Sequence, residues 1–178
     1  RYRGQPIAAV AADPEARRIG ERLFINYCAT CHGSDARGYR GFPDLTDNAW
    51  LWGGSPDQIK HSILVGRSGV MPAWEESLGA EGISDVTDYI FSMSGRDVDQ
   101  VSAARGKQKY EMFCVACHGA DGGGNQALGS PNLTDNVWLY GGSVGAVKQT
   151  IVSGRNGVMP AFNDLLGEDK IHLLTAYV

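Results

Sequence analysis

The chain has 178 residues, of which 43% are hydrophobic and 20% charged, and its formal net charge is −4. This composition is typical of a globular protein, and the mild negative charge excludes a strongly basic nucleic-acid-binding protein. No apolar run approaches the roughly 18 residues of a membrane-spanning helix, and no secretory leader is recognisable, so we expect any leader or anchor to precede Arg1.

The first half of the chain predicts helices separated by glycine-rich loops. Asp13 as N-cap and Pro14 at the first helical position predict a helix that reaches Tyr27. The expected elements that follow are a loop up to Pro43, a short helix over 56–65 and a last helix over 83–94.

The second half repeats the same order. "NYCATCHGSDARG" (26–38) matches "MFCVACHGADGGG" (112–124), and "LTDNAWLWGGS" (45–55) matches "LTDNVWLYGGS" (133–143). "IKHSILVGRSGVMPAW" (59–74) likewise matches "VKQTIVSGRNGVMPAF" (147–162). We therefore predict two copies of one small domain, over 1–95 and 96–178, with the second terminal helix clipped about a turn short of its twin.

No strand pattern of useful length is present, so the predicted fold class is all-α. Each repeat is short and rich in glycine, which leaves a thin apolar core. A large buried cofactor would fill that gap.

The four cysteines indicate which cofactor. Cys28-x-x-Cys31-His32 and Cys114-x-x-Cys117-His118 are c-type haem attachment motifs, in which two thiols bond the vinyl groups and the histidine ligates the iron. The alternatives are a thioredoxin-type redox pair, a structural zinc site and local disulfides. A redox pair would not need a histidine after both motifs, the two pairs lie 86 residues apart, too far for a usual zinc site, and local disulfides would be strained. We therefore expect two covalent haem c groups.

A second axial ligand is expected from the repeated Gly-Val-Met-Pro-Ala segment. Met71 follows His32, and Met159 follows His118, at similar spacing, and proline and glycine suit a stiff loop that crosses the porphyrin closely. We predict His32 with Met71 on one iron and His118 with Met159 on the other. The alternative is that both methionines only fill the core.

Neighbouring residues are expected to support these ligands. Pro43 and Pro131 are predicted to offer carbonyls to the ligating histidines. Arg67 and Arg155 are expected to pair with haem propionates, and the alternative is that both are simply exposed. The weaker candidates for the axial position are His61, His172, Met93 and Met112. The last of these is expected to be a core residue.

The chain resembles a tandem pair of class I cytochrome c domains. In that family the first and last helices cross through a glycine and aromatic residues, which Gly20, Phe24 and Tyr89 match here, as do Gly106, Tyr110 and Tyr177. The segments "LTDNAWLWGGS", "IKHSILVGRSGVMPAW" and "VTDYIFSMSG" resemble the dihaem subunit III of cbb3-type haem-copper oxidases.

This resemblance implies electron transfer without substrate chemistry in this chain, at the periplasmic face of a bacterial inner membrane. The implied partners are a donor c-type cytochrome and an acceptor oxidase subunit, with the membrane reached only through an anchor that this chain lacks. Two other functions stay open: a soluble periplasmic dihaem shuttle, and a dihaem peroxidase or gas sensor with a labile ligand.

Overall fold

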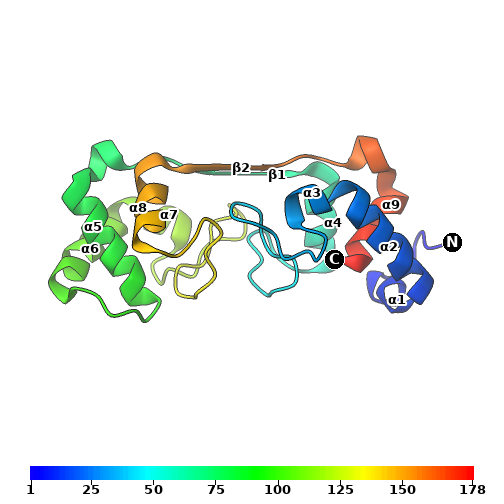
Figure 1. Cartoon of the computed structure of the whole chain (residues 1–178), viewed down its shortest axis with the longest axis horizontal. Coiled ribbons are helices and arrows are strands. Elements are labelled where there is room, and N and C mark those ends of the chain that lie inside the picture. The colour runs from blue at the N-terminus through cyan, green and yellow to red at the C-terminus, as the bar shows by residue number, and fades with distance from the viewer. The chain divides into compact units, whose positions relative to one another are not determined.

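The computed structural model describes all 178 residues, and it is mainly helical (Figure 1). The helices of the first half are α1 (Ile7–Ala12), α2 (Pro14–Tyr27), α3 (Ala29–His32), α4 (Pro56–Val65) and α5 (Glu75–Met93). Those of the second half are α6 (Gln100–Phe113), α7 (Val115–His118), α8 (Val144–Ser153) and α9 (Asn163–Tyr177). Every helix is either too short or too polar to span a membrane.

Side-chain caps begin several of the helices, and the sequence predicts the one at Asp13. The carboxylate of Asp13 accepts hydrogen bonds from the backbone amides of Glu15 and Ala16 at the start of α2. Asp99 caps α6 in the same way. Ser55 and Gln58 form a reciprocal capping box at the start of α4, which satisfies amides that no helical carbonyl reaches.

The two terminal helices begin earlier than predicted because each is interrupted by a glycine. Gly79 in α5 has φ 62° and ψ 174°, and Gly167 in α9 has φ 70° and ψ 163°. A short helical segment precedes each interruption, and the predicted helices correspond to the longer segments that follow it.

Two short strands lie where the sequence indicates only loop. β1 (Arg67–Met71) and β2 (Arg155–Met159) are hydrogen-bonded neighbours in a two-stranded sheet. Each strand contains the repeated Arg-x-Gly-Val-Met segment, so the expectation of no strand is wrong at these two places.

The compact units of the structure do not coincide with the predicted domains 1–95 and 96–178. Unit 1 comprises Arg1–Ser68 together with Val158–Val178, and unit 2 comprises Gly69–Gly157. The chain passes from one unit to the other within β1 and returns within β2. The terminal helix of unit 1 is α9, which belongs to the second sequence repeat, and the terminal helix of unit 2 is α5, which belongs to the first.

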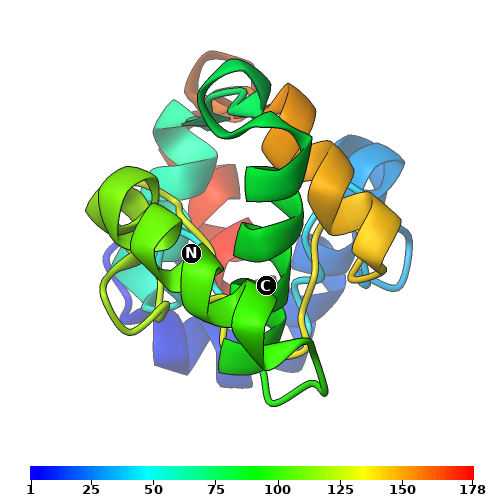
Figure 2. The ribbon, with the colours of Figure 1, turned by 90° about the vertical axis from the view of Figure 1, so that its left-hand side faces the viewer.

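Helix contacts follow this exchange. In unit 1, α9 packs against α1, α2 and α4, so the red C-terminal helix lies beside the blue N-terminal ones in Figure 1. In unit 2, α5 packs against α6 and α8, and Figure 2 shows α5 and α6 side by side.

The predicted helix crossings are present with their partners exchanged. A Cβ on Gly20 would lie 2.6 Å from the Cβ of Tyr177, and the rings of Phe24 and Tyr177 are 5.5 Å apart. In unit 2, Gly106 lies against the carbonyl oxygen of Asp85.

The aromatic pair of the second crossing is Tyr89 with Tyr110, whose ring centroids are 5.2 Å apart. Glycine is required at both crossings because a side chain would meet backbone atoms of the partner helix. The terminal helix in each crossing therefore comes from the other repeat, contrary to the expected grouping.

Candidate cofactor-binding sites

Each Cys-x-x-Cys-His motif lies on a single helical turn. Cys28 ends α2, and its carbonyl accepts the amides of Cys31 at 3.1 Å and His32 at 2.9 Å. The carbonyl of Cys114 accepts the amides of Cys117 and His118 at the same distances. A spacing of three residues on such a turn places both thiols of a motif on one side of it.

Both motif histidines are buried and held by a backbone carbonyl. Nδ1 of His32 lies 3.1 Å from the carbonyl oxygen of Pro43, and Nδ1 of His118 lies 3.1 Å from that of Pro131. These are the hydrogen bonds that the sequence predicts. Because a carbonyl only accepts, Nδ1 carries the proton in each ring, and Nε2 presents its lone pair.

Burial shifts the pKa of three of the motif side chains towards the uncharged form. It lowers the pKa of His118, which favours the neutral imidazole that a metal requires. It raises the pKa of Cys28 and of Cys114 to about 11, with the neighbouring cysteine adding to the effect. The two cysteine pairs lie in different units, so they do not share one ligand shell.

The methionines lie in the unit opposite to the predicted one. Met159 packs with the cluster around Phe24 and Cys28 in unit 1. Met71 packs with the cluster around Tyr110 and Cys114 in unit 2. The predicted pairs His32–Met71 and His118–Met159 are therefore wrong as groupings, because β1 and β2 carry each methionine into the unit of the other histidine.

Backbone contacts fix the methionine segments in their new places. In unit 1 the amide of Phe162 donates to the carbonyl of Ile63 at 3.0 Å, which satisfies the end of α4. Gly66, at φ +74°, follows that helix, and a side chain there would overlap the carbonyl of Met159. The repeated glycine before arginine thus serves this close passage.

Unit 2 has the same arrangement, with the helix supplied by the second repeat and the methionine segment by the first. The amide of Trp74 donates to the carbonyl of Ile151 at 2.9 Å. Gly154, at φ +65°, lies against the carbonyl of Met71. The same contacts therefore occur twice, each between a helix of one repeat and the methionine segment of the other.

The two arginines stay with their own repeats. Arg67 donates from Nε to Ser62 Oγ at 2.8 Å, and its guanidinium lies 4.9 Å from the ring centre of Trp52. Arg155 donates from Nη2 to Thr150 Oγ1 at 2.7 Å and lies 4.6 Å from the ring centre of Tyr140. Each unit thus contains one motif, one methionine and one such arginine.

Unpartnered donors in unit 2 test whether the residues fit a haem. Nε of Arg155 and Nε1 of Trp138 are buried and have no hydrogen-bond partner. Buried donors are normally satisfied, so two of them indicate an acceptor from outside the chain. Haem propionates are acceptors of this kind, and the donor set fits them. The unpartnered N–H of Trp138 is visible only in the structure.

The weaker candidates for the axial position differ in their burial. His61 is exposed, and Met112, expected in the core, is 74% exposed because it lies on the outer face of α6. Met93 packs at the edge of the unit 2 core, and its sulfur lies against Gly122. His172 is half-buried on α9.

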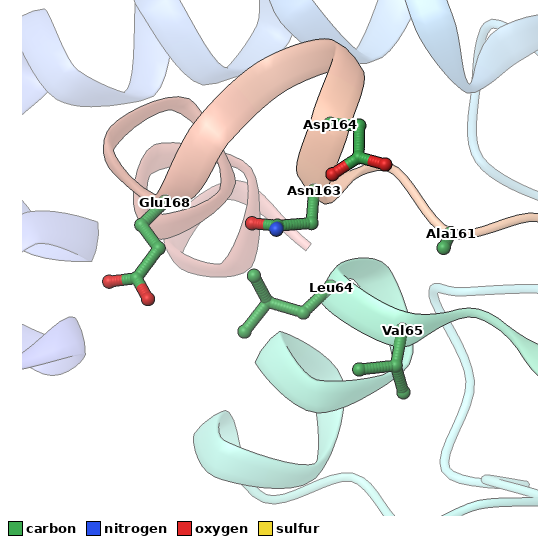
Figure 3. A pocket seen from close by; sticks show the side chains of 6 residues that line it. All are labelled: Leu64, Val65, Ala161, Asn163, Asp164 and Glu168. Atoms are coloured by element: carbon green, nitrogen blue, oxygen red, sulfur yellow. The ribbon is translucent and has the colours of Figure 1, made fainter.

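A surface hollow in unit 1 is separate from these groups. It has a volume of about 430 Å³ and lies between the end of α4 and the start of α9, where Leu64, Val65 and Ala161 face Asn163, Asp164 and Glu168 (Figure 3). None of the motif cysteines, histidines or methionines lines it, so it contributes nothing to the predicted sites.

Fold and site together define a class of protein: a c-type cytochrome with two tandem cytochrome c domains and a haem c attachment site in each. The family model for cytochrome c oxidase, cbb3-type, subunit III matches residues 15–90 and 101–178, which are the two sequence repeats. The chain belongs to this family.

Curated relatives agree with this assignment. The chain is 48% identical over 179 residues to the cbb3-type cytochrome c oxidase subunit CcoP of Rubrivivax gelatinosus, with all of this chain and 59% of the relative covered. It is 42% identical over 186 residues to subunit FixP of Azorhizobium caulinodans, and 39% identical over 191 residues to subunit CcoP of Cereibacter sphaeroides. Both comparisons cover 97% of this chain and 64% of the relative, so the chain spans about three fifths of these relatives.

Proposed function

We propose that this chain transfers electrons through two haem c groups. In unit 1 the iron ligands are His32 and Met159, and in unit 2 they are His118 and Met71. The proposal rests on one observation: each unit contains a motif histidine with a free Nε2 and a methionine from the opposite repeat.

The residues of the chain have distinct roles in this proposal. The motif thiols would bond the haem, and the proline carbonyls fix the imidazole rings. The methionine sulfurs would ligate each iron and favour its ferrous state. Arg155 and Trp138 would donate to propionates in unit 2. The haem itself supplies the one-electron change between ferric and ferrous iron.

Coordination by histidine and methionine leaves no open position for oxygen or peroxide, which favours a relay over substrate chemistry in this chain. As a member of a family of oxidase subunits, the chain would receive electrons from a donor c-type cytochrome. It would pass them to the catalytic oxidase subunit at the periplasmic face of a bacterial inner membrane. We infer that the chain is not itself catalytic.

Mass and optical spectra of the holoprotein test the proposal. The mass should exceed that of the polypeptide by two haems. The ferric spectrum should show the weak near-infrared methionine–iron band with intensity for two haems, and the ferrous protein should bind carbon monoxide poorly. Strong carbon monoxide binding by the unmodified protein would instead support the peroxidase or sensor function.

Single methionine variants test the ligand assignment. Met71→Ala should halve the near-infrared band, lower the potential of one haem and open that iron to carbon monoxide, and Met159→Ala should do the same to the other haem. Exposed Met112→Ala is the matched control and should leave both haems unchanged. An unaltered band in both ligand variants would refute the assignment.

A further inference from the structure

The two terminal helices occupy equivalent places in the two units but present different side chains there. In the repeat alignment, Asp85 of α5 corresponds to Leu173 of α9, and Asp88 corresponds to Ala176. α5 packs on α6 in unit 2, and α9 packs on α2 in unit 1. The surroundings of these two pairs show which helix suits which unit.

In unit 2 the carboxylate of Asp85 is 1% exposed and fully paired. It accepts from Ser102 Oγ at 2.9 Å and from Lys109 Nζ at 2.9 Å. It also accepts from Arg105 through Nη2 at 2.7 Å and Nε at 3.1 Å. All three donors lie on α6, so this polar cluster joins α5 to that helix.

In unit 1 the same place is apolar. The α2 residues equivalent to Ser102, Arg105 and Lys109 are, in that order, Ala16, Ile19 and Leu23. Leu173 and Ala176 of α9 pack there against a buried cluster of Tyr2, Val10 and Ala16, with Ile19 at its edge. This cluster offers a carboxylate no positive charge, and its only polar side-chain group is the hydroxyl of Tyr2.

Exchanging the terminal helices between the units would therefore break both arrangements. With α5 on α2, Asp85 would be buried against Ile19, and Asp88 would replace Ala176 beside α1. A buried carboxylate without a partner is strongly unfavourable. With α9 on α6, Leu173 would face Arg105 and Lys109, and both cations would lose their carboxylate.

We propose that Asp85, together with Ser102, Arg105 and Lys109, selects the exchanged pairing of the terminal helices. Met71 lies a few residues before α5 in the sequence, and Met159 lies a few residues before α9. Each methionine therefore lies in the same unit as the helix that comes after it. Asp85 is thereby the positioning residue that decides which methionine faces which histidine. The statement about iron ligation rests on the proposed function, whereas the statement about helix pairing does not.

Methyl NMR of the full ferrous holoprotein, labelled at alanine, isoleucine, leucine and methionine, tests both statements separately. The unmodified protein should give one set of signals, with contacts between the methyl groups of Leu173 and Ile19. The methyl group of Met159 should contact the haem bonded to Cys28. Contacts of Leu173 with α6 instead would overturn the proposal.

The decisive variant is Asp85→Leu/Asp88→Ala, which gives α5 the apolar residues of α9. Either pairing then places one leucine on α2 and one on α6, so the preference should largely vanish. A second set of signals should appear, with a population above about one tenth of the total. Exposed Glu75→Gln/Glu76→Gln, on the same helix, removes the same number of charges and should keep one set.

Transplanting the α6 side of the cluster should reverse the pairing. The variant has these substitutions: Ala16→Ser, Ile19→Arg, Leu23→Lys, Ser102→Ala, Arg105→Ile and Lys109→Leu. Here α5 should pair with α2, and Met71 should move to the haem bonded to Cys28.

The outcomes distinguish the two statements. A single set of signals with unchanged pairing in Asp85→Leu/Asp88→Ala refutes selection by the cluster, whether or not the transplanted variant folds. If the helix contacts are as expected but neither methionine contacts a haem, the selection stands and the proposed ligation fails.

Discussion

Replacing Asp85 with asparagine keeps the shape of the side chain and removes its charge. The amide oxygen of the substituted side chain would still accept from Ser102, but its nitrogen would face the donors of Arg105 and Lys109. Hydrogen bonds to charged groups contribute about 1.5–3 kcal/mol each, and at least one such bond to each cation is weakened or lost. Because the side chains of Arg105 and Lys109 are 47% and 32% exposed, they can return to water, which reduces the cost.

We therefore expect Asp85→Asn to lower the free energy of unfolding of unit 2 by about 2–3 kcal/mol. For a domain of this size that corresponds to a fall of roughly 10–20 °C in melting temperature. The assay is thermal unfolding of the holoprotein, combined with hydrogen exchange of peptides from α6. Half-buried Asp88→Asn, one turn further along α5, is the control and should change stability by less than about 0.5 kcal/mol.

The same variant should alter the response to acid. Hydrogen bonds from Arg105, and then from Lys109 and Ser102, hold the pKa of Asp85 well below its usual range, against the opposing effect of burial. A depressed pKa contributes stability above the unfolded value of about 3.9, and this stability is lost as pH falls through the folded value. Unit 2 should thus weaken below about pH 4 in the unmodified protein and less steeply in Asp85→Asn. Equal acid slopes, or an unchanged melting temperature, would refute this account of the cluster.

Three further variants have expected outcomes. Gly106→Ala should destabilise unit 2 by more than about 2 kcal/mol in thermal unfolding, because its methyl group would overlap the carbonyl of Asp85. The control is Gly145→Ala, in open space on α8, which should be neutral or stabilise by up to about 1 kcal/mol. Leu174→Ala, in the core of unit 1, should cost about 2–5 kcal/mol, against less than about 0.5 kcal/mol for exposed Leu165→Ala, measured by denaturant titration. Ser55→Ala should cost about 1 kcal/mol through loss of the capping box, visible as faster hydrogen exchange in the first turn of α4.

Local features of the sites could be predicted from the sequence because each depends on nearby residues. The cysteine spacing defines one helical turn, and Pro43 follows His32 closely enough for a loop to return its carbonyl. The cap at Asp13 is equally local. These predictions needed no knowledge of which unit each segment joins.

The exchange could not be predicted from the repeat itself. Because both repeats carry the same glycine and aromatic positions at the helix crossing, Tyr89 and Tyr177 fit either partner helix equally well. Only positions at which the repeats differ distinguish the two pairings, and Asp85 against Leu173 is the clearest of them. The strands escaped prediction because they form only where the two exchanged connections meet each other.

The exchange also makes the two units unequal in folding. Unit 2 is one continuous segment, whereas unit 1 is completed only when Val158 returns to Ser68. Closing a loop of the length of unit 2 costs about 4 kcal/mol, by the (3/2)RT ln n relation, when that segment is unfolded. A folded unit 2 holds Gly69 and Gly157 in place through β1 and β2, which removes most of this cost. Leu174→Ala should therefore expose α2 to hydrogen exchange without affecting α6. Asp85→Asn should instead reduce the protection of both helices against hydrogen exchange. The opposite pattern would show that unit 1 folds first.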